Sequence, residues 1–175
     1  MLIVAVYQEG EYDSVLARIK EKIDTLCIEM GETLSEAAIV DFEKQCGIRL
    51  PSAYRAFLKA VGDGCEQMLD GFALRRLADI PRRNLALPFG LEEAWIWEDE
   101  EAVEEALIAD RVYQGEIELI DIGCGMTYHL IVCGKCRGEV WCFTDVGVQP
   151  CAERQDFLGW FELWLDEQEE TDYFQ

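Results

Sequence analysis

The stretch Leu34–Gly64, with the sequence LSEAAIVDFEKQCGIRLPSAYRAFLKAVGDG, predicts two successive helices. Thr33 stands three residues before Glu36, which is the spacing of a capping box, and Ser35 is a competing N-cap. The first helix therefore begins near Ser35. It ends before Gly47, a residue that suits a C-terminal cap.

The second helix of this stretch begins at Pro51, because proline suits a first turn in which its missing N–H would be unpaired anyway. Two glycines, Gly62 and Gly64, end it. Apolar residues at helical spacing are expected to form the buried faces of the two helices: Ile39, Phe42 and Cys46 on the first, and Tyr54, Phe57, Leu58 and Val61 on the second.

Toward the N-terminus, Leu2–Tyr7 is expected to be a short strand, which Gly10 interrupts. A helix should follow over Tyr12–Cys27. Its apolar residues recur at helical spacing and predict one buried face: Val15, Leu16, Ile19, Ile23 and Leu26.

Beyond Gly64 the pattern changes to short β segments. The expected strands are Phe72–Leu74, Ala94–Trp97, Glu116–Ile122, Tyr128–Cys133 and Glu139–Phe143. Glu100–Ala109 is expected to be a short acidic helix, and the glycine-bounded turn Gly134–Gly138 predicts a hairpin. An amphipathic helix over Gln155–Gln168 closes the chain. This order predicts an α+β fold with N-terminal helices, a mainly antiparallel sheet of about five to six strands, and a C-terminal helix.

The charge balance is strongly acidic, with 36 Asp and Glu against 15 Lys and Arg and a formal net charge of -21. Such a chain repels phosphate backbones, which disfavours nucleic-acid binding. A basic protein partner would be steered toward it, although acidity also serves solubility alone. No signal peptide or membrane-spanning stretch is visible in the sequence, so we expect a cytoplasmic protein that does not bind membranes.

The eight cysteines are expected to be reduced thiols, since the core is large enough to need no disulfide. Cys133 and Cys136 form a CxxC, and Cys124, His129 and Cys142 are near enough in sequence to complete a zinc site, with Cys124 and His129 as the candidates beside the CxxC. The alternative is a hairpin turn that happens to carry thiols, and this is the interpretation we favour. A thioredoxin-like role is disfavoured, because a strand rather than a helix follows the motif.

Catalysis finds little support in the sequence. A nucleophile would need a base, most often histidine, and His129 is the only one in the chain. A Cys124–His129 pair is one interpretation, but we favour a strand histidine held by hydrogen bonds. We therefore expect no catalytic residue, no cofactor and no enzymatic activity.

The acidic segment Glu92–Glu105 has the best claim to a functional role. It holds eight acidic residues among fourteen and no Lys or Arg. Tryptophan can anchor a partner that carboxylates attract, although the alternative is a solvated helix face beside buried tryptophans. The candidate partner-binding residues are Glu92, Glu93, Trp95, Trp97, Glu98, Asp99, Glu100, Glu101, Glu104 and Glu105.

Two other charged segments stand out. Glu162–Asp172 is expected to lie on the exposed side of the last helix. Four arginines lie within nine positions and are expected either to neutralise nearby carboxylates or to form a basic patch: Arg75, Arg76, Arg82 and Arg83.

The order of these motifs resembles the SUKH superfamily, which includes fungal cell-wall regulators and bacterial immunity proteins of toxin systems. The resemblance lies in Phe42-Glu43, Gly47-Ile48 and the Leu50-Pro51-x-x-Tyr54-x-x-Phe57-Leu58 motif, then in Asp121-Ile122-Gly123, Gly138-Glu139-Val140-Trp141 and Phe157-Leu158-x-Trp160-Phe161. It covers most of residues 34–168. On this basis we expect one domain over residues 1–175, with an N-terminal extension (1–33), a family-like core (34–168) and an acidic tail (169–175).

The resemblance implies a binding domain without catalytic residues. Members that are immunity proteins neutralise a cognate toxin by direct binding, so the expected partner is a toxin domain, in particular a basic one. The alternative is a regulatory or scaffold interaction domain, as in the fungal members. Whether the chain also forms homo-oligomers is left open.

Overall fold

A computed structural model describes residues 6–68, 71–96, 111–151 and 155–170. The helices are α1 (Tyr12–Thr25), α2 (Glu36–Cys46), α3 (Ser52–Ala60) and α5 (Phe157–Glu170), with 3₁₀ turns at Glu9–Glu11 and Leu77–Asp79. The strands are β1 (Trp95–Ile96), β2 (Glu116–Asp121), β3 (Thr127–Ile131), β4 (Val140–Thr144) and β5 (Gly147–Pro150). No helix within these described ranges is long and apolar enough to cross a membrane.

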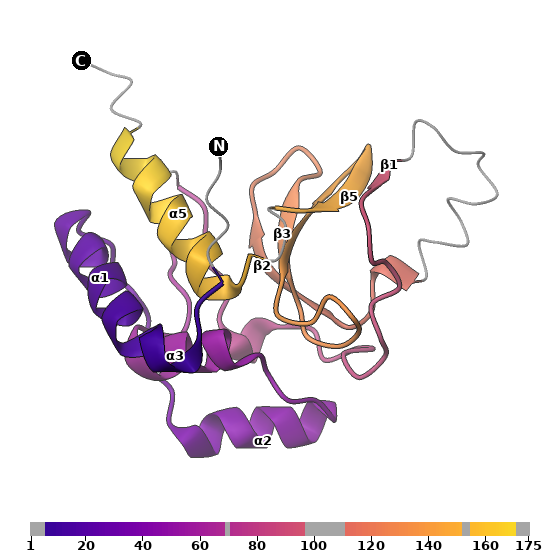
Figure 1. Cartoon of the computed structure of the whole chain (residues 1–175), viewed down its shortest axis with the longest axis horizontal. Helices are drawn as coiled ribbons and strands as arrows, with labels where there is room; N and C mark the ends of the chain where they lie inside the picture. Colours follow the sequence, from indigo (N-terminus) through magenta and orange to yellow (C-terminus); the bar gives the residue numbers. More distant parts are fainter. Residues whose placement is uncertain (1–5, 69–70, 97–110, 152–154, 171–175) are drawn as a thin grey trace.

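The strands form one antiparallel sheet with the order β1-β5-β4-β3-β2. The helices lie to one side of it, with α1 beside α5 (Figure 1). The α+β class, the N-terminal helices and the closing helix are therefore confirmed. The expected number of strands is not, because within the described residues only β2 to β5 form a regular four-stranded meander and β1 adds two residues beside β5.

The residues predicted to cap α2 at both ends do so in the structure. The Ser35 hydroxyl accepts a hydrogen bond from the Ala38 N–H at 3.2 Å and caps α2, and Gly47 ends that helix with a left-handed φ of 67°. Ser35, and not the competing capping box at Thr33, is thus the cap. Pro51 stands at the N-cap of α3, one position before the first turn.

One predicted strand is not a strand in the structure, and one observed strand was not predicted. Phe72–Leu74 is not a strand, since Leu74 makes only an isolated bridge with Cys65. Conversely, the sequence pattern did not identify β5, which contains Gly147 and Pro150. The hydroxyl of Thr144 forms the tight turn before β5 by accepting the amide protons of Val146 and Gly147.

Some sequence predictions fall outside the described residues. These are most of the strand Leu2–Tyr7, the acidic helix Glu100–Ala109 and the tail beyond residue 170. The helix predicted over Tyr12–Cys27 is α1, which ends two residues early because Cys27 adopts a left-handed φ of 56°. The four apolar residues expected on its buried face within these bounds are buried: Val15, Leu16, Ile19 and Ile23.

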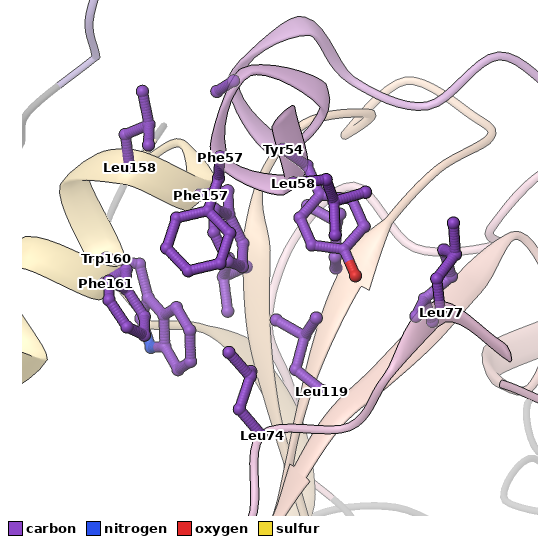
Figure 2. Close-up of a cluster of buried hydrophobic side chains, with 14 of the residues drawn as sticks. Tyr54, Phe57, Leu58, Leu74, Leu77, Leu119, Phe157, Leu158, Trp160 and Phe161 are labelled. Atoms are coloured by element: carbon purple, nitrogen blue, oxygen red, sulfur yellow. The ribbon is translucent and has the colours of Figure 1, made fainter. Parts of the chain in front are cut away.

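The main core lies between the helices and one face of the sheet, which we call the inner face. Aromatic rings from α3 and α5 form its centre (Figure 2). The ring of Phe57 lies 4.9 Å from that of Phe157 and 4.7 Å from that of Phe161, both edge to face. All three side chains have no exposed surface. The Leu-Pro-x-x-Tyr-x-x-Phe motif therefore functions as a helix start followed by core residues.

A β-bulge in β2 determines which of its residues face the core. The register between β2 and β3 shifts between Glu118 and Ile120, so Leu119 and Ile120 are both buried on the inner face. Strict alternation would have placed Ile120 on the opposite face. The extra residue brings Asp121 back to the opposite face, in register with Thr127.

One buried carboxylate joins α1 to α5. Arg18 donates two hydrogen bonds to Glu162, at 2.9 and 3.0 Å, and Tyr7 and Lys22 donate one each, at 2.8 and 3.1 Å. Burial opposes ionisation of Glu162, but these donors outweigh it and lower its pKa to about 2. Glu162 is only 6% exposed, which corrects the expectation that Glu162–Asp172 as a whole is solvated.

Truncating Phe161 to alanine should remove about 3–5 kcal/mol from the free energy of unfolding, because it opens a cavity between α3, α5 and the sheet. Urea unfolding followed by circular dichroism measures this. Leu87→Ala, at a side chain that is 47% exposed, is the matched control and should change stability by less than about 0.5 kcal/mol. Equal losses in both variants would contradict the assigned core.

Glu162→Gln should destabilise the protein by about 2 kcal/mol at pH 7, because charge-assisted hydrogen bonds are lost. The pKa of Glu162 is lower in the folded chain than its ordinary value of 4.5. Its stabilisation is therefore present above pH 4.5 and is lost as the pH falls toward 2.

Urea unfolding of wild type and variant between pH 7 and pH 3 should show their stability difference shrinking below about pH 4.5. Glu21→Gln, at an exposed position of α1, should show little difference at any pH. A difference for Glu162→Gln that stays constant down to pH 3 would contradict this role of the carboxylate.

Candidate functional site

The second face of the sheet, which we call the outer face, carries a smaller hydrophobic cluster. Trp141 and Phe143 of β4 and Val148 of β5 are buried there. They pack with residues that flank the acidic segment on both sides in the sequence, Phe89 and Val112 among them. The described residues that precede and follow the acidic segment are thus packed on the outer face.

The described part of the acidic segment matches the prediction only in part. Glu92 and Glu93 are exposed, and Glu92 forms an ion pair with Lys135 at 2.6 Å. Trp95 packs partly buried against the outer cluster, and its indole Nε1 is buried with no hydrogen-bond partner in the described ranges. The remaining candidates lie outside the described residues: Trp97, Glu98, Asp99, Glu100, Glu101, Glu104 and Glu105.

A polar cavity of about 550 Å³ adjoins this cluster beside β2 and β3, and we call it the β2–β3 pocket. Glu116, Glu118 and Asp121 line it together, because the bulge returns Asp121 to the outer face. Tyr113 also lines the pocket and is 58% exposed, although its ring contacts the buried Phe143. An exposed aromatic beside carboxylates has the composition of a protein-binding surface.

The histidine of the chain lies at the wall of this pocket. His129 Nδ1 is 2.5 Å from a Glu116 carboxylate oxygen, and Nε2 is 2.7 Å from the Thr127 hydroxyl. The imidazole is 3% exposed and stacks on Phe143 with ring centroids 3.8 Å apart. Both ring nitrogens are therefore occupied, which confirms the expectation of a strand histidine held by hydrogen bonds.

This carboxylate–imidazole–hydroxyl chain has the order of groups found in hydrolytic triads. Such a triad also needs an accessible nucleophile and N–H donors directed at a developing oxyanion. Thr127 is instead a ladder residue, paired with Asp121 on one side and Phe143 on the other. The neighbouring N–H of Met126 is already donated to Gly123. The arrangement therefore orients side chains on the outer face, and the imidazole nitrogens are engaged by Glu116 and Thr127 rather than by the Cys124 thiol.

Two of the four clustered arginines neutralise carboxylates. Arg75 forms an ion pair with Glu118, and Arg76 forms one with Glu66. Arg82 hydrogen-bonds to Gln45 and lies over the ring of Phe42. Arg83 lines the β2–β3 pocket. The expectation of neutralisation is thus supported for the first two, and the pocket carries both signs of charge.

The four residues considered for zinc are not assembled into one centre. The Cys136 thiol donates to the carbonyl of Leu91 at 3.5 Å, whereas the Cys133 thiol donates to that of Ala86 at 3.4 Å. Cys124 is exposed in the β2–β3 turn, and His129 is engaged as described. Within the described ranges, no three His, Cys, Asp or Glu side chains are grouped to hold a metal ion.

Most of the chain matches a known protein family. Residues 33–167 match the family described as SMI1/KNR4 (SUKH-1). The match contains the motif helices, the whole described sheet and most of α5, and it begins after α1. A search of curated proteins found no match.

The cysteines should differ in reactivity according to their burial. Iodoacetamide at pH 8 should modify the exposed Cys27 and Cys124 first. Cys136 should react at least about 10-fold more slowly, because burial raises its pKa to about 11 and thiolate is the reactive form. Peptide mapping by mass spectrometry measures the order.

The control is the same labelling in urea, where all cysteines should react alike. If Cys133 and Cys136 became reactive in the folded protein only after a chelator was added, the structure-based assignment would be wrong and the zinc interpretation would stand.

Proposed function

The chain belongs to the SMI1/KNR4 family (SUKH-1), and from this premise we propose that it is a non-catalytic protein-binding domain that neutralises a cognate toxin by direct binding. The family match, which spans residues 33–167, is the observation that carries the proposal. Within the family, immunity proteins act in this way, by occupying the toxin and not by chemistry. The fold alone does not determine the partner, so its nature is argued from the surface.

The surface favours a basic partner. The formal net charge of -21 produces an attractive field for a cationic protein over distances of about 10 Å at 0.1 M salt. Glu92 and Glu93 continue this charge onto the outer face, next to the partly buried Trp95. We propose that the toxin meets the outer face, with the acidic segment steering it and aromatic side chains anchoring it.

The polar groups that adjoin the β2–β3 pocket support the proposal of a binding surface. In the described ranges, the polar groups that adjoin the β2–β3 pocket are engaged with one another: Glu116 with His129, and Glu118 with Arg75. Groups held in this way present a preformed binding surface with little conformational entropy to lose on association.

The test is coexpression with the toxin encoded beside its gene, followed by purification and a growth assay. We expect a stable complex and protection of the cells. The association rate should fall by about 10-fold when the ionic strength rises from low to physiological. Neither complex nor protection would overturn the proposal, and capture of a host protein instead would favour the regulatory alternative.

A pair of charge-matched variants locates the contact. Neutralising the acidic segment at Glu100, Glu101, Glu104 and Glu105 with glutamine should slow association. Neutralising four exposed carboxylates of the helical side, Glu21, Asp24, Glu29 and Asp41, changes the net charge equally. Equal slowing in both variants would show that only the overall charge matters and would remove the acidic segment as the contact region.

A further inference from the structure

Two cavities adjoin the edge of the sheet at β2. The first is the β2–β3 pocket on the outer face, and the second, of about 480 Å³, lies beside Leu74–Arg76 and Leu119. Asp121 lines both cavities. We call the two cavities together the β2 groove. Since β2 is the last strand of the described sheet, the groove borders an edge strand.

The free side of β2 retains hydrogen-bonding capacity. A strand at the edge of a sheet presents backbone N–H and C=O groups that no neighbouring strand pairs. In the described part of the chain, residues of β2 make one backbone hydrogen bond outside the sheet, in which the Arg75 N–H donates to the Leu119 carbonyl at 2.8 Å. The part of β2 before Leu119, residues Glu116–Glu118, therefore offers its edge to a further extended segment.

The side chains along the β2 groove carry an excess of negative charge. Five carboxylates line it against three arginines. Two of these arginines are already engaged, Arg75 with Glu118 and Arg76 with Glu66. Asp121 accepts the Gly123 N–H at 2.8 Å, but the ion pairs of the described residues do not include it. A positively charged occupant is therefore complementary to the groove.

The spacing of the carboxylates favours an occupant in an extended conformation. Glu116 and Glu118 lie two positions apart on the outer face, about 7 Å along the strand, and the bulge keeps Asp121 on that face. Alternate side chains of an extended segment repeat at the same distance. A segment with basic residues at alternate positions therefore places these residues beside the carboxylates, as in cross-strand ion pairs.

The same carboxylates argue against a second copy of the chain as the occupant. Pairing of two β2 edges would bring the acidic side chains of both copies next to one another, and like charges opposite each other destabilise a sheet. Charged residues on an edge strand are a common protection against such self-pairing. The β2 edge is thus selective for a basic segment.

Tyr113 connects the β2 groove with the face on which we place the toxin. Its side chain is 58% exposed and lines the β2–β3 pocket, and its ring centroid lies 5.8 Å from that of Phe143 in the outer cluster. An exposed aromatic ring can pack against the aliphatic stem of a lysine or stack with an arginine. A partner on the outer face is therefore within reach of the groove.

We propose that the β2 groove binds an extended segment of the protein partner, with basic side chains at alternate positions beside Glu116, Glu118 and Asp121. This inference rests on the proposed function, because it names the chemistry and the conformation of the element that the partner presents. Backbone hydrogen bonds to the free side of β2 contribute affinity, and the carboxylates select for charge. The ion pair with Arg75 uses Oε1 of Glu118, so Oε2 is left for the partner.

The first test titrates the full chain with the peptide acetyl-Thr-Lys-Thr-Lys-Thr-amide and follows it by ¹H–¹⁵N NMR. We expect saturable shifts of the Tyr113 and Glu116–Glu118 amides, with a dissociation constant on the order of millimolar. The peptide acetyl-Thr-Thr-Lys-Lys-Thr-amide has the same composition and charge but adjacent lysines, and it should bind at least about 3-fold more weakly. Equal binding of the two peptides, or shifts confined to other elements, would overturn the assignment.

Two other occupants give distinct outcomes. Cadaverine carries two ammonium groups but no peptide backbone, so it should bind at least about 3-fold more weakly than the alternating peptide. Binding as tight as that of the peptide would assign the groove to a free diamine. Sedimentation velocity should show a monomer, and a dimer that the peptide dissociates would assign the groove to a second copy. Either result would overturn the inference.

The variant Asp121→Asn isolates the charge of one groove carboxylate. Asparagine retains an oxygen that can accept the Gly123 N–H, so the urea midpoint should stay unchanged. Binding of the alternating peptide should weaken at least about 3-fold. Asp41→Asn, at an exposed position of α2, changes the net charge equally and should bind as the wild type does. Equal weakening in both variants would show that overall charge alone attracts the peptide, and the inference would fail.

The opposite change of charge in the groove should produce a gain, which misfolding does not. Arg83 is an exposed cation of the β2–β3 pocket, so Arg83→Gln should bind the alternating peptide about 2-fold more tightly. Lys20→Gln removes a cation from an exposed position of α1 and should leave binding unchanged. Weaker binding by Arg83→Gln, or an equal gain in both variants, would contradict the inference.

A final measurement uses the complex with the toxin. If Asp121→Asn lowers the affinity for the toxin at least about 5-fold more than Asp41→Asn does, the groove contact is supported. If the two variants bind the toxin equally, this inference fails while the proposed function stands. If the alternating peptide binds the β2 groove but the toxin does not bind the chain, the proposed function fails and the groove contact stands for a different basic protein.

Discussion

The packing of α5 against α3 is the contact on which the rest of this structure depends. Phe57 reaches Phe157 and Phe161 from a distant part of the sequence, and all three rings are completely buried. Burying large aromatic side chains is the strongest single contribution a small core can have. Other side chains of α5 then contact further elements. Glu162 accepts hydrogen bonds from Arg18 of α1, and Trp160 packs in the main core on the inner face of the sheet (Figure 2).

The sheet then divides the chain into two environments. On the inner face, alternate residues of the strands join the main core with the helices. On the outer face, β4 and β5 carry aromatic and aliphatic residues, whereas β2 and β3 carry carboxylates, a histidine and a threonine. The single extra residue in β2 adds to the polar side, because it allows two consecutive apolar residues to face the core and brings Asp121 to the outer face.

Two buried polar groups differ in how fully the described residues satisfy them. Glu162 has donors for both of its oxygens and an ionised side chain, so its burial contributes to stability through the contact between α1 and α5. The indole Nε1 of Trp95, in contrast, is buried with no hydrogen-bond partner among the described residues. The hydrogen-bonding capacity of the first group is used within the described residues, whereas the second group leaves one donor unpaired there.

The sequence by itself determined the helices, the fold class and the family. Caps at Ser35 and Gly47 and apolar spacing in α1, α2 and α3 are local properties, since they depend on contacts within a few residues. The acidic composition is also a property of the sequence alone, because it follows from which residue types are present. Only the tertiary structure decided the bulge, the strand β5, the burial of Glu162 and the β2–β3 pocket. These depend on pairings between residues far apart in the chain, and the packing of those pairs outweighs the local preferences that a sequence pattern records.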